Sequence, residues 1–207
     1  MVDVVTDTRL RIIEAARTRL LADGYAGLST RKVAEEAGVP LSQLHYHFGS
    51  KGGLITALFA EENNRLLERQ TEMYSQDKPL WQRYEQACDF LEDDLESGYV
   101  RVLQEMLAAG WSNPAIGNVV RDLLSRWFVL LAEVAREAER RFGALGPFTP
   151  EEIATLVANA FIGSEALLLL GFERPVMPIR SALRRIGVLI REREEAAGAP
   201  EATVVAG

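Results

Sequence analysis

The chain has 207 residues, of which 48% are hydrophobic and 26% are charged, so its length and composition suit one or two globular domains. Its one cysteine, Cys88, excludes an internal disulfide and gives no sign of an oxidising compartment. The first residues are acidic where a secretory signal would be basic, and the most apolar run, 166–172, is too short to cross a bilayer. These features predict a cytoplasmic protein without a membrane segment.

The net charge of −7 is unevenly distributed along the chain. Residues 1–54 hold seven Lys and Arg against six Asp and Glu, so this segment carries +1 and the remainder carries −8. DNA binding requires only a local basic face, because charges further away than about 8 Å are screened at physiological salt. The acidic total therefore does not exclude DNA binding by the first 54 residues, but it argues against DNA wrapping around the whole molecule.

Apolar residues recur at spacings of three and four along the chain, and no alternating β-branched run is present. The pattern predicts an all-α fold of about nine helices. In chain order, the expected helices cover residues 8–22, 29–37, 40–48, 50–74, 80–97, 99–109, 114–142, 149–170 and 177–195. Residues 1–7 are expected to form a loose arm. The segment 198–207 is small, contains Pro and lacks aromatic residues, so it is expected to be disordered.

Residues 29–51 have the pattern of a helix-turn-helix. Ser29 is suited to cap the first helix, and Gly38 to end it in a left-handed conformation. In the second helix, Leu44 and Phe48 lie four residues apart and face inward, which leaves the other side chains of residues 41–47 on the outer surface. The second helix of such a motif enters the DNA major groove.

This stretch resembles the DNA-binding half of the tetracycline-repressor (TetR) family of bacterial transcription regulators. The resemblance covers about the first quarter of the chain and rests on Gly24-Tyr25, Thr30-Arg31-Lys32-Val33-Ala34, Ala37-Gly38-Val39, Leu44, Phe48, Ser50-Lys51 and Leu54. It implies a DNA-binding domain over 1–54 and a helical ligand-binding and dimerisation domain over 55–197. It also implies a homodimer through the last two helices, which binds a palindromic operator on double-stranded DNA and represses transcription until a small molecule releases it.

The predicted DNA contacts lie in and beside the second helix of the motif. Gln43 can bond adenine N6 and N7 together, Ser42 can bond several bases, and Leu41 can meet a thymine methyl group. His45 can donate to a phosphate or stack on the backbone sugar, and Tyr46 and His47 are candidates for phosphate contact. The resemblance implies phosphate contact for Thr30, Arg31 and Lys51. The chain departs from the family pattern at Pro40, Leu41, His45 and the pair Gly52-Gly53, so the operator sequence should not be taken from relatives.

Other chemistry finds little support in the sequence. His45 and His47 are two residues apart, which places them about 200° apart around a helix, so they cannot easily share one metal ion. There is no Ser/His/Asp set and no Gly-rich phosphate loop. We therefore expect no catalytic residue, no metal and no cofactor, and a protein that is not an enzyme.

The last two expected helices carry more apolar surface than one core face requires, which favours a four-helix bundle with a second copy. The predicted interface residues are Ile153, Val157, Ala160, Gly163, Leu167, Leu168, Leu183, Ile186, Leu189 and Ile190. The alternative is that helix 149–170 is simply the most buried helix of a monomer.

The resemblance also implies an apolar ligand pocket in the second domain, between the helices 50–74 and 149–170. Candidate lining residues are Trp81, Tyr84, Cys88, Met106, Trp111, Trp127, Phe128, Asn159, Phe161 and Glu165. The aromatic candidates can equally be plain core, and Glu165 needs a partner, either an arginine across the dimer or a cationic ligand. Two alternatives stay open: a regulator of the same fold without a small-molecule effector, and an all-α binding or catalytic protein that has inherited the helix-turn-helix.

Overall fold

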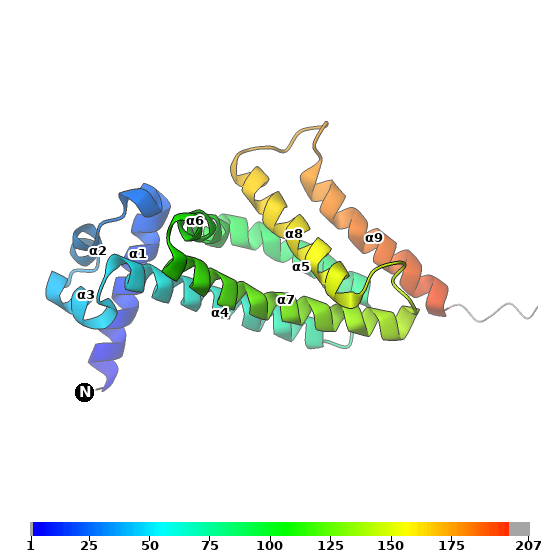
Figure 1. The fold of residues 1–207 in the computed structure, drawn as a ribbon, viewed down its shortest axis with the longest axis horizontal. Coiled ribbons are helices and arrows are strands. Elements are labelled where there is room, and N and C mark those ends of the chain that lie inside the picture. The colour runs from blue at the N-terminus through cyan, green and yellow to red at the C-terminus, as the bar shows by residue number, and fades with distance from the viewer. Residues whose placement is uncertain (1, 199–207) are drawn as a thin grey trace, which may run out of the picture. The chain divides into compact units, whose positions relative to one another are not determined.

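The computed structural model describes residues 2–198, with side chains from residue 7 onward. This part of the chain contains nine helices and one isolated β-bridge between Arg174 and Met177. The helices are α1 (Val2–Gly27), α2 (Thr30–Glu36), α3 (Leu41–Phe48), α4 (Lys51–Ser75), α5 (Leu80–Ser97), α6 (Tyr99–Ser112), α7 (Pro114–Phe142), α8 (Pro150–Leu169) and α9 (Ile179–Gly198) (Figure 1). The predicted all-α fold is confirmed.

The two ends of the chain differ from the expectation. The arm expected over residues 1–7 is instead helical from Val2, because α1 starts there and continues to Gly27. Within α1, Gly24 adopts a φ of +67°, which breaks the helix and favours glycine. Gly198 is the last residue of α9, and the rest of the expected disordered tail lies outside the described residues.

Two compact units make up the fold, and the chain passes between them more than once. The first contains the residues up to 69 together with 94–126, and the second contains 70–93 together with the residues from 127 onward. Helices α4, α5 and α7 therefore each have one part in either unit. Packing thus groups α6 with the N-terminal helices. The predicted boundary at residue 54 separates a DNA-binding function from a ligand-binding one, and it stays a prediction.

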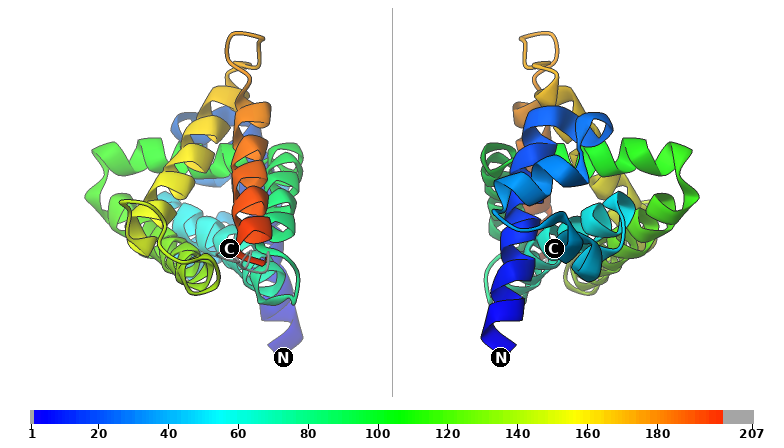
Figure 2. Two further views of the ribbon diagram at one scale, coloured as in Figure 1. Left: turned by 90° about the vertical axis from the view of Figure 1, so that its right-hand side faces the viewer. Right: turned by 90° about the vertical axis from the view of Figure 1, so that its left-hand side faces the viewer.

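The first unit has one hydrophobic core that holds the helix-turn-helix in place. Its fully buried members come from α1, α2, α3, α4 and α6 and include Ile12, Leu20, Val33, Leu44, Leu54, Leu58, Phe59 and Met106. Helix α1 packs against α2, α3 and α6 (Figure 2, right). The Tyr25 amide donates to Glu105 Oε2 of α6 at 3.0 Å, which fixes the segment that follows the Gly24 break. The orientation of α2 and α3 is therefore set by packing and not by the short helices alone.

The second unit consists of the end of α4, most of α5, the second half of α7, and the pair α8 and α9, which lie side by side (Figure 2, left). A capping box starts α8: Thr149 Oγ1 accepts from the Glu152 amide, and the Glu152 carboxylate accepts from the Thr149 amide. Trp127 donates its indole N–H to Gln70 Oε1 at 2.7 Å. The capping box pairs amides at the exposed start of α8, and the Trp127–Gln70 bond pairs two polar groups that burial would otherwise leave without a partner.

Within the described part of the chain, α8 is the one helix that is long and apolar enough to cross a membrane. It has 20 residues, and 22% of its most apolar 18-residue stretch is buried in the structure. The expectation based on the run 166–172 was too narrow, because the apolar composition extends back to Pro150. Length and composition of this kind are shared by helices that pack against other helices, as α8 does against α9.

Candidate DNA-binding surface and ligand pocket

Helices α2 and α3 form the predicted helix-turn-helix around a left-handed glycine. Gly38 has a φ of +63°, and the Val39 amide donates back to the Ala34 carbonyl, so the chain turns sharply after α2. Ser29 is the N-cap of α2 in an extended conformation, but its hydroxyl makes no capping hydrogen bond. Ser29 therefore occupies the predicted N-cap position, but the predicted hydrogen bond from a backbone amide to its hydroxyl is wrong.

Helix α3 separates an inward face from an outward one as predicted. Leu44 is fully buried and Phe48 is half-buried against the core of the first unit. Leu41, Ser42 and Gln43 are exposed in the first turn of α3. In a helix-turn-helix, residues at the N-terminal end of the second helix contact base edges, so these three side chains are placed where such contacts are made.

The structure limits how His45 can contact DNA. Its Nδ1 lies 3.0 Å from the Gly49 carbonyl oxygen, which can only accept, so Nδ1 carries the proton. In the neutral ring Nε2 is then an acceptor, and a phosphate oxygen is also an acceptor. His45 can therefore donate to phosphate only as the imidazolium ion.

The other predicted phosphate contacts differ in how free they are. Tyr46 is exposed, and its ring meets that of the half-buried His47 edge-on at 5.2 Å. Thr30 is half-buried at the start of α2, and the exposed Arg31 pairs with Glu35 at 3.4 Å. None of these contacts removes the side chains from the surface. No group of three or more potential metal ligands occurs within the described part of the chain.

Lys51 has a structural contact that the sequence did not reveal. Its Nζ donates to the Tyr25 carbonyl at 2.5 Å and lies 4.5 Å from the centre of the Tyr25 ring. Burial lowers the pKa of this ammonium group. Lys51 therefore ties the start of α4 to the end of α1, just after the break at Gly24, and phosphate contact by the same side chain stays a prediction.

We expect Lys51→Ala to lower the free energy of unfolding by about 1.5–3 kcal/mol, since it removes a hydrogen bond made by a charged group. Lys32→Ala is the matched control, because Lys32 is exposed and pairs only weakly with Asp23 at 3.4 Å; its loss should cost about 0–1 kcal/mol. Urea unfolding of both variants measures the difference. Equal losses would show that the Tyr25 contact contributes nothing to stability.

The glycine pair after Lys51 has two different roles. A Cβ on Gly53 would lie 2.2 Å from the Phe48 carbonyl oxygen, and this clash could be relieved only by a movement of the backbone. A Cβ on Gly52 would meet only the Ser50 hydroxyl, at 3.7 Å. The Gly53 amide also donates to Ser50 Oγ at 3.1 Å, so α4 starts on a capping bond. Gly53 thus permits the close approach of α3 and α4.

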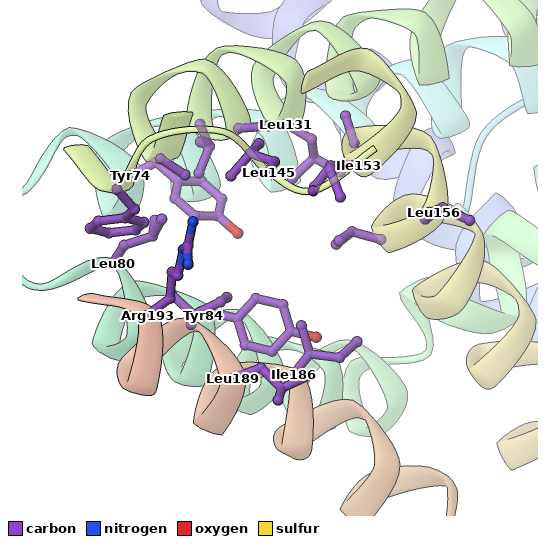
Figure 3. Close-up of a pocket in the computed structure, with 18 of the residues that line it drawn as sticks. Tyr74, Leu80, Tyr84, Leu131, Leu145, Ile153, Leu156, Ile186, Leu189 and Arg193 are labelled. Atoms are coloured by element: carbon purple, nitrogen blue, oxygen red, sulfur yellow. The ribbon is translucent and has the colours of Figure 1, made fainter. Parts of the chain in front are cut away.

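The second unit contains an apolar pocket with a volume of about 560 Å³. It is lined by the last turn of α4, by α5, α7, α8 and α9, and by the segment 144–146 (Figure 3). Its lining residues are Tyr74, Leu80, Tyr84, Leu131, Val134, Ala135, Ala138, Phe142, Ala144, Leu145, Gly146, Ile153, Ala154, Leu156, Val157, Ile186, Leu189, Ile190 and Arg193. The pocket is therefore built mainly of aliphatic side chains. Helix α4 contributes only its end.

Of the predicted ligand residues, only Tyr84 lines this pocket. Met106 and Trp111 belong to the first unit, so the predicted set does not gather around one cavity. The others lie in the second unit but away from the lining: Trp81, Cys88, Trp127, Phe128, Asn159, Phe161 and Glu165. Aromatic character was the wrong signal here, because these rings pack on each other and on helices, as Phe161 does edge-on against Tyr84 at 6.0 Å.

The residues predicted for the dimer interface fall into three groups. Half of them line the pocket: Ile153, Val157, Ile186, Leu189 and Ile190. Leu183 is buried within its own unit, where its carbonyl accepts from the Tyr84 hydroxyl at 3.1 Å, so it is not available to a second copy. The remaining members are exposed or half-buried along α8: Ala160, Gly163, Leu167 and Leu168.

Comparison with known proteins agrees with this geometry. Residues 12–58, which span most of α1 through the first turns of α4, match the family of bacterial regulatory proteins described as the tetR family. This N-terminal segment is the DNA-binding part of a TetR-family regulator. The chain is 24% identical to the HTH-type transcriptional regulator UidR of Escherichia coli K12 over 149 residues, which cover 68% of this chain and 70% of that protein. The chain is accordingly a DNA-binding transcriptional regulator.

Other transcriptional regulators resemble the chain over shorter or longer stretches. The HTH-type transcriptional repressor AcnR of Corynebacterium glutamicum is 35% identical over 66 residues, 32% of this chain and 35% of that protein. The transcriptional regulator FadR of Bacillus subtilis in complex with stearoyl-CoA has a TM-score of 0.70 at 16% identity, covering 86% of this chain and 97% of that one. A regulator from Saccharomonospora viridis in complex with choline has a TM-score of 0.73 at 20% identity, covering 90% and 96%. At these identities the solved structures show a shared fold.

Proposed function

We propose that this TetR-family regulator is a cytoplasmic repressor that binds a palindromic operator as a homodimer and is released by a small apolar ligand. One observation carries the DNA-binding part: α3 buries Leu44 and half-buries Phe48 while it exposes Leu41, Ser42 and Gln43 in its first turn. The repressor AcnR, which is 35% identical over 66 residues of the chain, supports the direction of regulation.

The dimer is supported by apolar surface that a single chain leaves open. Leu156 on α8 is 53% exposed and Leu189 on α9 is 63% exposed, and Leu169 and Leu170 continue the apolar surface at the end of α8. Exposed apolar side chains on two adjacent helices favour a bundle with the same helices of a second copy. Such a dimer presents two α3 helices to two half-sites on one face of DNA.

The ligand is supported by the pocket in the second unit. Its volume of about 560 Å³ and its aliphatic lining are those of a small-molecule site. Two proteins of the same fold were solved with small molecules, stearoyl-CoA in one and choline in the other. A ligand in this pocket lowers operator affinity only if it binds more tightly to a conformation that fits the operator poorly. Helix α4 contains both Lys51 and the pocket residue Tyr74, which makes it a route for such a change.

Random-site selection on duplex DNA with the purified protein tests this proposal. We expect a palindrome whose half-site centres lie about 34–36 Å apart, or a multiple of this distance. Enrichment of single, unrepeated sites would contradict the dimer, and the absence of any enriched sequence would contradict specific recognition by α3.

Gln43→Ala should relax the preference at one base pair of each half-site by about 1–3 kcal/mol, because the amide can bond adenine at two positions. Arg31→Ala is the control, since a lost phosphate contact weakens all sequences alike. Fluorescence anisotropy with the selected site and with single-base variants measures both. A uniform loss for Gln43→Ala across all sequences would remove it from base recognition.

A further inference from the structure

We propose that the pocket in the second unit takes a molecule with an apolar chain and a negatively charged group at one end, and that Arg193 binds this group. The inference rests on the proposed function only in taking this pocket as the ligand site. It adds the chemical class of the ligand and the end at which the ligand is held.

Arg193 is the one charged residue among those that line the pocket. Its Nη2 donates to the Ala144 carbonyl at 3.2 Å, and no carboxylate lies within 4.0 Å of its guanidinium in the described part of the chain. Earlier arginines of α9 are paired: Arg180 with Glu92 and Arg184 with Asp89, each at 2.7 Å. A guanidinium has five N–H donors, so Arg193 keeps donors available at the pocket wall.

The Tyr74 hydroxyl is a second polar group that can bind the charged end of the ligand. Within residues 7–198, the Tyr74 hydroxyl has no hydrogen-bond partner, and Figure 3 shows it pointing into the cavity that Arg193 also enters. Burial raises the pKa of Tyr74, so the group stays a neutral donor. The hydroxyl of Tyr84, by contrast, donates to Leu183. Two donors, one of them charged, can thus receive the acceptor atoms of an anionic group.

The rest of the lining suits an apolar chain. Leu131, Ile153 and Ile186 bring aliphatic side chains from three helices to the cavity, and Leu156 lies at the other end from Arg193 (Figure 3). No acidic side chain is among the lining residues, so nothing would compensate a ligand cation placed beside Arg193. The cationic ligand considered for Glu165 has no support here, since Glu165 does not line the pocket.

Isothermal titration of the full chain with dodecanoate, dodecyl phosphate and dodecanol tests the inference. We expect both anions to bind about 10- to 100-fold more tightly than the alcohol, which is the range for a hydrogen bond to a charged group. Arg193→Met should remove this preference by weakening the binding of both anions to about the level of dodecanol. Arg193→Lys should restore part of the preference. Arg185→Met is the matched control, because Arg185 is exposed on the same helix and does not line the pocket.

The outcomes separate the inference from the proposed function. Equal affinity for dodecanol and the two anions, or an unchanged anion preference in Arg193→Met, would overturn the anion site and leave an apolar pocket in place. Failure of all three compounds to bind the wild-type chain would overturn the proposed ligand site, and the inference with it. A preference for one anion over the other identifies the charged group as carboxylate or phosphate. Thermal unfolding of each variant shows whether it is folded. If Arg193→Met does not fold, the affinities of the wild-type chain for the three compounds test the inference.

Discussion

Glu137→Ala is expected to lower the free energy of unfolding by about 3–5 kcal/mol, because it leaves a buried charge without its partner. Arg83 of α5 is 2% exposed, and its Nη2 donates to Glu137 Oε1 at 2.6 Å. Its Nη1 donates to the Tyr74 carbonyl at 2.6 Å, at the end of α4. The arginine therefore joins α4, α5 and α7 beside the pocket. After the substitution its guanidinium keeps the carbonyl but loses the only carboxylate that the described residues place against it.

The same ion pair predicts a dependence on pH. The hydrogen bond from Arg83 holds the pKa of Glu137 below its usual value of 4.5. The unfolded chain then takes up the proton at a higher pH than the folded one. The contribution of the pair to stability is fully present above about pH 4.5 and is lost as the pH falls through the lower pKa of the folded state. The difference in unfolding free energy between wild type and Glu137→Ala should therefore shrink below that pH.

Glu133→Ala is the control for the first prediction. Glu133 lies one turn earlier on α7 and is exposed, and it pairs with Arg136 at 2.6 Å. An exposed pair contributes about 0–1 kcal/mol. Urea unfolding followed by circular dichroism compares the two variants. A loss for Glu137→Ala no larger than that for Glu133→Ala would contradict the account of Arg83 as a buried charge that depends on this partner.

Gly53→Ala is expected to destabilise the first unit by about 1–3 kcal/mol and to weaken operator binding with it. The added Cβ would lie 2.2 Å from the Phe48 carbonyl oxygen, so α3 and α4 must move apart. Phe48 ends the helix that carries Gln43, so this movement would turn the proposed base contacts. The loss of stability comes from a clash between the new Cβ and a backbone carbonyl, which no change of side-chain rotamer can relieve.

Gly52→Ala is the matched control, and its expected sign is opposite. The site is open, with the nearest atom at 3.7 Å, and alanine favours helix over glycine by about 1 kcal/mol. Thermal unfolding and anisotropy on the selected operator measure both variants. Equal behaviour of the two alanine variants would contradict the close approach at Gly53.

The features that were predictable from the sequence are local ones. Gly38 ends α2, and the spacing of Leu44 and Phe48 defines the inner face of α3, because each depends on residues within one or two turns. The all-α class and most helix limits follow from apolar spacing in the same way. The start of α1 was missed, since the acidic residues before Thr8 gave no helical stripe.

The pocket and the roles of charged residues depend on which helices meet. Arg193 and Tyr74 are 119 positions apart in the sequence, and nothing local to either marks a shared cavity. Of the aromatic residues expected at the pocket only Tyr84 lines it, and most of the lining comes from aliphatic side chains of α7, α8 and α9. Lys51 matched the family as a phosphate contact, and its bond to the Tyr25 carbonyl appears only when α1 and α4 are placed together. Tertiary contacts such as these have no periodic signal.

Operator affinity measured by fluorescence anisotropy tests the central proposal most directly. The selected palindrome and a shuffled duplex of the same composition should be compared at one physiological salt concentration. We expect the palindrome to bind at least about 10³-fold more tightly, as specific sites do relative to non-specific DNA. Equal affinity for the two duplexes would contradict sequence recognition by α3, and with it the account of this chain as an operator-specific repressor.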